Sequence, residues 1–349
     1  MKRFLPLLLA LILLTGCGAG NPSVEKQEKI VYAMDTVMRL TAYGNQAETA
    51  LMDATSEIHR LDSLLSTALE GSEIDQINRN RDVIVSRETG LLLQRALEIA
   101  EMTDGAFDPT VYPLMKAWGF ASESGGNNYR VPTDVDSLLS LVDYRKVRLQ
   151  EITEGDNAGS FRVTFPATEP MGLDLGGIAK GYTSQKVLET IQAAGVDTAV
   201  ISLGGNVGVM GTKPDGSSWT VGVRDPNGDE NDYLATLSLT GQAQPQYVIT
   251  SGGYERYFEQ DGVRYHHILD PHTGYPADTG LLSVTVVSSD GTLADALSTA
   301  LFVMGRDKAQ NYWRQHSGEF DMILFDGTTL YTTPGVALDT AYPVTEVTP

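Results

Sequence analysis

Short β-like runs joined by glycine-containing turns fill most of the chain from residue 146 onward, and this pattern constrains the fold more than any other feature. Only two stretches of this region, 178–194 and 293–304, have the length and pattern of helices. A doubly wound parallel sheet needs a crossover helix between its strands. The sequence therefore favours an α+β fold with mixed and antiparallel sheets and packed helices. The predicted strands are 147–149, 161–165, 199–203, 219–224, 234–239, 247–250, 263–269 and 281–287.

The earlier part of the chain adds one strand and two helices. Residues 30–43 alternate apolar and polar side chains, as a strand does, and apolar residues then recur at helical spacing over 47–65. Ser86 is a suitable N-cap for a second helix, which Gly105 would end. No proline- or serine-rich linker divides the chain. We therefore expect one compact catalytic unit over 30–340, single or bilobal, followed by a loose tail at 341–349.

The charge balance limits the classes of partner. The chain has 25 basic and 45 acidic residues, a formal net charge of −20. Binding to a nucleic-acid backbone depends on basic surface, so nucleic acid is excluded as the main partner. An anionic small molecule remains compatible, provided that a local cation or a cradle of backbone N–H groups offsets the overall negative field.

The N-terminus has the features of a secretory signal. Lys2 and Arg3 precede an apolar run over 4–14, which is too short to span a bilayer. The run ends at Cys17, the only cysteine, in a context that resembles a bacterial lipobox; the alternative is an ordinary cleaved signal. We expect a signal peptide at 1–16, lipidation at Cys17 and a polar tether over 17–29, which place the protein in the bacterial cell envelope, facing the extracytoplasmic side. A lone cysteine allows no intramolecular disulfide, so the core must provide the stability.

Several common signatures are missing. The chain contains no GxxxxGK[ST], GxGxxG, HExxH, CxxC or GxSxG pattern, which argues against a P-loop NTPase, a Rossmann site, common zinc sites and α/β-hydrolases.

Residues 174–182 (Asp-Leu-Gly-Gly-Ile-Ala-Lys-Gly-Tyr) are the first candidate site. A strand-like segment is followed by two glycines and a helix start, where backbone N–H groups can bind phosphate. Asp174 could accept hydrogen bonds from a ligand, and Lys180 could neutralise a phosphate. In the alternative interpretation Asp174 is an N-cap and Lys180 is solvated.

Residues 292–299 (Thr-Leu-Ala-Asp-Ala-Leu-Ser-Thr) are the second. Asp295 and Thr299 lie four residues apart on one helix face, and their oxygens suit Mg²⁺. The spacing alone favours a different interpretation, in which Thr292 and Asp295 form a capping box and Thr299 bonds back to a carbonyl.

Three turn segments complete the candidates. Three of the five histidines lie within 265–274. His266 and His267 must point to opposite faces of a strand, so at most one of them enters a given pocket. A single imidazole that acts as a base or binds a phosphate is therefore more plausible than a zinc site. Residues 104–110 form an Asp-Pro turn in which Phe107 and Asp108 would suit an aromatic heterocycle. Residues 251–254 are a similarly ambiguous turn after a strand. The alternative for each is a plain polar loop.

Taken in order, these segments resemble the ApbE family of flavin transferases over residues 30–330. The segments that carry the resemblance are 34–36 (Met-Asp-Thr), 105–108 (Gly-Ala-Phe-Asp), 174–182, 203–206 (Leu-Gly-Gly-Asn), 250–253 (Thr-Ser-Gly-Gly), 267–271 (His-Ile-Leu-Asp-Pro) with 273–274, and 294–299. Two positions depart from commoner family forms: Asp35, where Gly is usual, and Gly177, where Ala or Thr is frequent.

The resemblance implies an activity, its cofactor and its partners. The expected reaction moves the FMN part of FAD to a Thr or Ser hydroxyl of a target flavoprotein, such as a redox-pump subunit or a secreted flavoprotein, with release of AMP. It implies Mg²⁺ held by Asp295, Thr299 and the main-chain carbonyl of Gly177, which favours the metal interpretation of the second segment. The expected FAD contacts are Met34, Ala106, Phe107, Asp108, Asp174, Lys180 and Ile268.

Mg²⁺ would cancel charge on the FAD diphosphate and stabilise the leaving AMP. His267 is the candidate base or phosphate orienter, and Asp270 more plausibly fixes its turn. Two alternatives stay open at this point: an FAD pyrophosphatase that yields FMN and AMP, and a lipid-anchored flavin-binding or solute-binding protein.

Overall fold

A nine-stranded sheet forms the centre of the structure, a computed structural model that describes residues 25–121, 128–229 and 232–349. All neighbouring strands run antiparallel except the last pair, β15 and β17. In spatial order the strands are β1 (Lys26–Ala33), β2 (Thr36–Tyr43), β6 (Ala199–Leu203), β7 (Asn206–Gly211), β10 (Gly241–Gly252), β13 (Ser283–Ser288), β14 (Asp321–Phe325), β15 (Leu330–Thr332) and β17 (Val344–Glu346). The predicted α+β class is confirmed.

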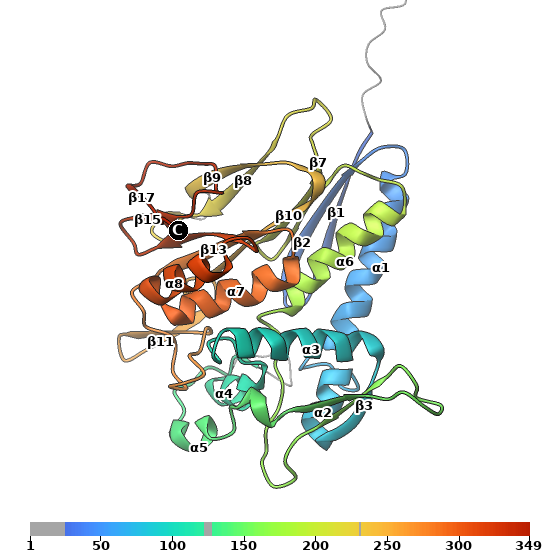
Figure 1. Ribbon diagram of the computed structural model, residues 1–349, viewed down its shortest axis with the longest axis vertical. Helices are drawn as coiled ribbons and strands as arrows, with labels where there is room; N and C mark the ends of the chain where they lie inside the picture. The colour runs from blue at the N-terminus through green and yellow to red at the C-terminus, as the bar shows by residue number, and fades with distance from the viewer. Residues whose placement is uncertain (1–24, 122–127, 230–231) are drawn as a thin grey trace, which may run out of the picture.

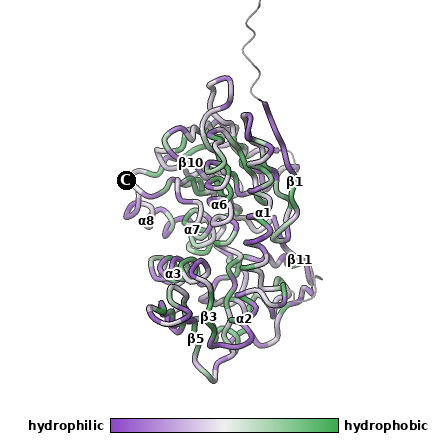
Figure 2. The backbone as a smooth tube through the Cα atoms, turned by 90° about the vertical axis from the view of Figure 1, so that its right-hand side faces the viewer, coloured by the Kyte–Doolittle hydropathy of each residue, from purple (hydrophilic) through white to green (hydrophobic). Residues whose placement is uncertain are grey.

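Three long helices cover one face of this sheet, as Figure 1 shows. They are α1 (Ala47–Leu65), α6 (Ala179–Ala193) and α7 (Gly291–Met304), and α8 (Arg306–His316) packs beside α7. The core lies between the helices and the sheet because the apolar stripe of α1 and the inward residues of β2 and β6 are buried there. Figure 2 shows hydrophobic backbone segments gathered inside the molecule and hydrophilic ones along many outer loops.

A small three-stranded sheet covers part of the other face. It consists of β8 (Trp219–Arg224), β9 (Tyr233–Leu239) and β16 (Leu338–Asp339). Trp219, Val221 and Leu237 form a second apolar cluster with Val209 and Val248 of the main sheet. The main sheet is therefore buried on both faces near its centre, which fixes its register.

The remaining elements lie below the sheet and its helices in the view of Figure 1. The helices are α2 (Glu73–Asn80), α3 (Arg87–Met102), α4 (Tyr112–Trp118) and α5 (Val135–Leu139), with the short helices η1 (Pro109–Val111) and η2 (Tyr144–Lys146). The strands are β3 (Asp82–Val85), β5 (Phe161–Thr164) and β4 (Arg148–Glu151) in one sheet, and β11 (Tyr257–Gln260) and β12 (Val263–His266) in a hairpin.

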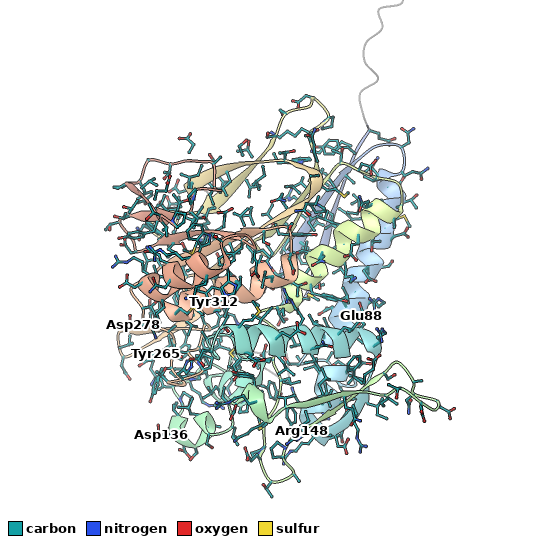
Figure 3. All side chains as sticks on the ribbon, in the orientation of Figure 1. Glu88, Asp136, Arg148, Tyr265, Asp278 and Tyr312 are labelled. Carbon is teal, nitrogen blue, oxygen red and sulfur yellow. The ribbon has the colours of Figure 1, made fainter. Side chains whose placement is uncertain are left out.

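An ionic cluster joins α3 to the helices of the main sheet. Arg60 of α1 donates to both Glu57 and Glu88, and Tyr182 of α6 donates to Glu88 across 2.9 Å. Figure 3 labels Glu88 at the end of α3 that faces α1 and α6. Hydrogen bonding to Arg60, and next to it the bond from Tyr182, lowers the pKa of Glu88 despite partial burial. This cluster ties the lower elements to the start of α6.

The predicted helices at 47–65, from Ser86 onward, at 178–194 and at 293–304 are confirmed. The single strand expected over 30–43 is wrong, because Met34 and Asp35 have φ of +50° and +55° and turn the chain back into the antiparallel pair β1 and β2.

Both predicted ends of the compact unit also need correction. The tether predicted for 17–29 overlaps β1, whose first four residues pair with β2. The tail at 341–349 is not loose, because Val344–Glu346 pairs with β15 and Val347 is buried. The proposed signal peptide at 1–16 and Cys17 lie outside the described residues. Among the residues that are described, no helix is long and apolar enough to cross a membrane.

Two neighbouring residues of α1 provide a test of the core. Leu51 is 1% exposed and Met52 is 53% exposed. Leu51→Ala should lower the free energy of unfolding by about 2–5 kcal/mol, because it removes buried methyl groups and leaves a cavity. Met52→Ala should change it by less than about 0.5 kcal/mol. Chemical denaturation of both variants measures the difference, and equal losses would contradict this packing of α1.

Candidate active site

Helices α6 and α7 touch at two glycines. A Cβ atom on Gly181 would collide with the carbonyl oxygen of Gly291 and with the side chain of Asp295. At this contact the backbone N–H of Gly181 donates to Oδ2 of Asp295 over 2.8 Å. The glycines therefore allow a carboxylate of one helix to reach the backbone of the first turn of the other, where the helix dipole favours negative charge.

Asp295 is a buried carboxylate that has no charged partner within the described part of the chain. It is 4% exposed, and Oδ1 accepts its hydrogen bond from the Asn206 amide over 3.1 Å. Both donors are neutral, and none of the ion pairs among the described residues includes Asp295. Burying a charge is costly unless an opposite charge compensates it. The site therefore fits a bound cation.

Thr299 lies one turn after Asp295 in α7, and Gly177 lies close to it. A Cβ on Gly177 would lie 3.5 Å from Oγ1 of Thr299 and 3.3 Å from the ring of Phe107. Thr299 is half-buried, and its recorded hydrogen-bond partner is Ser251 of β10, 3.3 Å away. The structure thus brings Asp295, Thr299 and Gly177 together, although they come from two distant stretches of the chain. Hard oxygen donors of this kind suit Mg²⁺.

The capping alternative for Asp295 is not what the structure has. The N-cap of α7 is Asp290, whose side chain accepts from the N–H of Leu293 over 2.9 Å, while Thr292 donates to Gln185. The carboxylate of Asp295 therefore has no role in capping its own helix. No three His, Cys, Asp or Glu residues of the described chain gather into a metal-ligating group, so hydroxyl and carbonyl oxygens would have to complete a metal site.

A second group of side chains surrounds the glycine turn before α6. Asp174 accepts from the N–H of Gly176 over 2.7 Å, and Lys180 donates to the Gly176 carbonyl over 3.3 Å. Burial raises the pKa of Asp174, while that N–H and the charges of Arg256 and Lys180 oppose the rise. The alternative of Asp174 as the N-cap of α6 is wrong, because Ile178 occupies that position and makes no side-chain cap.

His267 lies within reach of the same two cations. Burial, together with the charges of Lys180 and Arg256, lowers the pKa of His267 to about 3. Its Nδ1 lies 3.1 Å from the carbonyl oxygen of Arg256, which can only accept, so we assign the proton of the neutral ring to Nδ1. Nε2 is then an unprotonated nitrogen that can accept a proton or a hydrogen bond.

The neighbouring histidines have other partners. His266 accepts from the N–H of Ile268 through Nδ1 and contacts the Ala277 carbonyl through Nε2, and its ring packs edge-on against Phe302. His272 lies between Asp270 and the carbonyl of Asp104. The rings of His266 and His267 have different aromatic neighbours, Phe302 and Phe120, and β12 ends at His266. Asp270 accepts from the N–H of His272, so it holds its turn.

The side chains expected to contact the flavin nucleotide occupy four segments. Met34 lies at the β1–β2 turn, 3.6 Å from the hydroxyl of Thr183 in α6. Ala106, Phe107 and Ile268 are buried, and the ring of Phe107 faces Gly177.

Asp108 is already used within its own turn. Its carboxylate accepts from the N–H and hydroxyl of Thr110 and from the N–H of Tyr144, and burial raises its pKa. These bonds hold the 103–110 loop in place beside the glycine turn, whatever further contact the carboxylate makes.

Comparison with known proteins identifies the family of this chain. The family model described as "ApbE family" matches residues 34–324. The chain belongs to the ApbE family. It is 33% identical over 338 residues to the "FAD:protein FMN transferase" of Treponema pallidum, covering 92% of this chain and 90% of the relative. It is 36% identical over 304 residues to a protein of the same name from Klebsiella pneumoniae, covering 83% and 88%. The ApbE protein of Thermotoga maritima has a similar structure, with a TM-score of 0.76 at 35% identity, covering 90% of this chain and 97% of that one.

Three residues of this ApbE-family site were not singled out from the sequence. Asn206 and Ser251 lie in segments that carry the family resemblance but imply no role for them, and Arg256 lies outside those segments. Asn206 follows the two glycines of the β6–β7 turn, which predict the turn but not the contact of its amide with the Asp295 side chain. No local sequence pattern indicates that Arg256 belongs to the site, because the fold of the β11–β12 hairpin brings it next to His267.

The lowered pKa of His267 predicts a pH dependence of stability. Between the unfolded value of about 6.5 and the folded value of about 3, the unfolded chain binds the extra proton and the folded chain does not. Stability should therefore fall as the pH falls through this window, by up to about 1.4 kcal/mol per pH unit from this residue.

His267→Gln should remove that contribution. We expect the free energy of unfolding of the variant to depend less steeply on pH between 6 and 4 than that of the unmodified protein. Urea denaturation at several pH values measures both slopes. Equal slopes would contradict the buried, neutral state of His267.

Proposed function

We propose that this chain transfers the FMN part of FAD to a Thr or Ser hydroxyl of an acceptor flavoprotein, with release of AMP. The observation that carries the proposal is the meeting of Asp295, Thr299 and Gly177 at a buried, uncompensated carboxylate beside the α6 N-terminus. Family membership and the names of the relatives support it.

We propose Mg²⁺ as the cofactor of this site, held by Asp295, Thr299 and the carbonyl oxygen of Gly177. The donor set is one carboxylate, one hydroxyl and one carbonyl, all hard oxygens, and no ion pair among the described residues includes the carboxylate. When bound, the ion would neutralise charge on the diphosphate and on the leaving phosphate oxygen.

The other residues of the site favour an anionic substrate in a chain with a net charge of −20. Lys180 and Arg256 supply local positive charge, and the first turn of α6 adds its dipole. We assign binding of the nucleotide to Met34, Ala106, Phe107, Asp108, Asp174, Lys180 and Ile268. Phe107 and Asp108 belong to a loop held rigidly by hydrogen bonds, so they can orient a ligand without reorganising.

His267 is our candidate proton acceptor. In the proposed step the acceptor oxygen forms a bond to the FMN phosphorus, the bond from that phosphorus to the bridging oxygen breaks, and AMP leaves with the bridging oxygen. The hydroxyl proton passes to Nε2 of His267, whose Nδ1 proton is fixed on the Arg256 carbonyl. The low pKa makes the free imidazole a weak base, and a nearby diphosphate anion would raise that pKa.

One experiment separates the proposed activity from its alternatives. The protein is incubated with FAD, Mg²⁺ and a candidate acceptor flavoprotein, and the acceptor is then weighed by mass spectrometry while nucleotides are separated by chromatography. An acceptor heavier by one FMN, with one AMP released, supports transfer. Free FMN with AMP and no heavier acceptor supports a pyrophosphatase, and unchanged FAD supports a binding protein.

Two α7 carboxylates give a matched test of the metal assignment. Asp295→Asn should lower transfer by roughly 100-fold or more, because the amide lacks the charge that would hold the cation. Asp290→Asn also removes one negative charge but keeps a good N-cap, so its activity should stay near that of the unmodified protein. Thermal unfolding of both variants verifies the fold. Full activity of Asp295→Asn with Mg²⁺ supplied would disprove the assignment.

We further propose that the protein acts at the extracytoplasmic side of the bacterial envelope, anchored through a lipid on Cys17. Support comes from the apolar run at 4–14 and the lipobox-like context of that cysteine. Cys17→Ser should move the protein from the membrane fraction to the soluble fraction and abolish incorporation of labelled palmitate. A variant that remains membrane-bound and labelled would refute the anchor.

A further inference from the structure

Three hydroxyl groups form a row beside the proposed metal site. Ser251 of β10 lies 3.3 Å from Oγ1 of Thr299 and 2.8 Å from Oγ of Ser298. Ser298 in turn donates to the backbone carbonyl of Asp295 over 2.8 Å. The row therefore runs from one proposed metal ligand, Thr299, to the backbone carbonyl of another, Asp295.

The end of this row fixes the direction of every proton in it. A carbonyl oxygen can only accept, so the single proton of Ser298 points to Asp295. Ser298 must then accept in its contact with Ser251, so the proton of Ser251 points to Ser298. Ser251 has no second proton, and its contact with Thr299 requires Thr299 to donate. Each assignment follows from the one before it.

We infer that Ser251 and Ser298 are positioning residues that orient the hydroxyl of Thr299 toward cation binding. With its proton directed at Ser251, Oγ1 of Thr299 presents its lone pairs away from Ser251, and a cation binds to lone pairs. A Thr299 hydroxyl without this acceptor could turn its proton toward the cation and repel it. The inference rests on the proposed function, because it assumes that Thr299 is a metal ligand.

The frame that holds the row is rigid. Ser251 is paired with Val284 in the register between β10 and β13, and Ser298 is fully buried within α7. Neither hydroxyl can follow Thr299 if that side chain rotates. Residues that orient metal ligands in this way commonly change metal affinity about 10–100-fold when they are removed.

A control pair lies on the same strands. Thr250 and Thr285 are opposite each other in the β10–β13 register, and their hydroxyls lie 2.8 Å apart. Because side chains alternate along a strand, Thr250 points to the opposite face from Ser251. Thr250→Val removes a hydrogen bond between two hydroxyls, of similar length to the bond between Ser251 and Ser298, and leaves the row of three hydroxyls intact.

The test measures metal binding directly. Mn²⁺ serves as the probe, and its free concentration is followed by electron paramagnetic resonance in titrations of the full chain saturated with FAD, without acceptor. Ser251→Ala and Ser298→Ala should each raise the Kd for Mn²⁺ by about 10-fold or more. Ser251→Thr, which keeps the hydroxyl, should restore most of the affinity, and Thr250→Val should leave it unchanged.

Each outcome has a distinct meaning. If Asp295→Asn binds Mn²⁺ as tightly as the unmodified protein, the metal site of the proposed function is wrong, and this inference fails with it. If Asp295→Asn loses binding but Ser251→Ala and Ser298→Ala keep it, the metal site stands and the inference is overturned. Thermal unfolding is recorded for every variant. If Ser251→Ala does not fold, the inference is tested with the other two variants. Ser298→Ala must then weaken Mn²⁺ binding, and Ser251→Thr must retain it.

Discussion

The close contact of α6 with α7 is the constraint on which the rest of the site depends. Gly181 and Gly291 let the two helices approach so closely that a backbone N–H of one meets the Asp295 carboxylate of the other. The same contact puts the glycine turn before α6 next to Thr299, and it keeps Asn206 of β7 within reach of the carboxylate. A bulkier residue at either glycine would separate the oxygens that the proposed chemistry needs together. The atoms of Gly181, Gly291 and Asp295 therefore determine both how the two helices pack and where the carboxylate lies.

The site is assembled from segments of very different origin. The carboxylate and the hydroxyls of Ser298 and Thr299 lie on one rigid helix, the charges of Lys180 and Arg256 lie on a helix start and a hairpin, and Phe107 and Asp108 lie on a hydrogen-bonded loop. The ionic cluster around Glu88 joins the lower elements, which carry that loop, to α1 and α6. Because these segments meet only in the folded chain, binding of a dinucleotide and a cation would be linked to the stability of the whole unit.

Local patterns predicted the elements well and their contacts poorly. The helical spacing over 47–65 and the Ser86 cap led directly to α1 and α3, since periodicity and capping are local properties. The turn at Met34 and Asp35 contains no glycine, and only Asp35 is of a type enriched in the left-handed region, so the alternation over 30–43 predicts one unbroken strand. Asp295 was identified, but spacing alone favoured a cap; only the fold reveals that Asp290 caps α7. Arg256 and the partners of Ser251 could not be found from sequence, because a hairpin and a sheet register bring them to the site.

The shared use of Gly181 by packing and by chemistry has an evolutionary consequence. In a lineage that lost the activity, the carboxylate at 295 would no longer be retained, and selection would then act on 181 and 291 through stability alone. Alanine is the better helix former, so such a lineage would be expected to gain side chains at both positions and to move the helices apart. Glycine at both places in a distant family member would therefore indicate that the close contact of the two helices is retained.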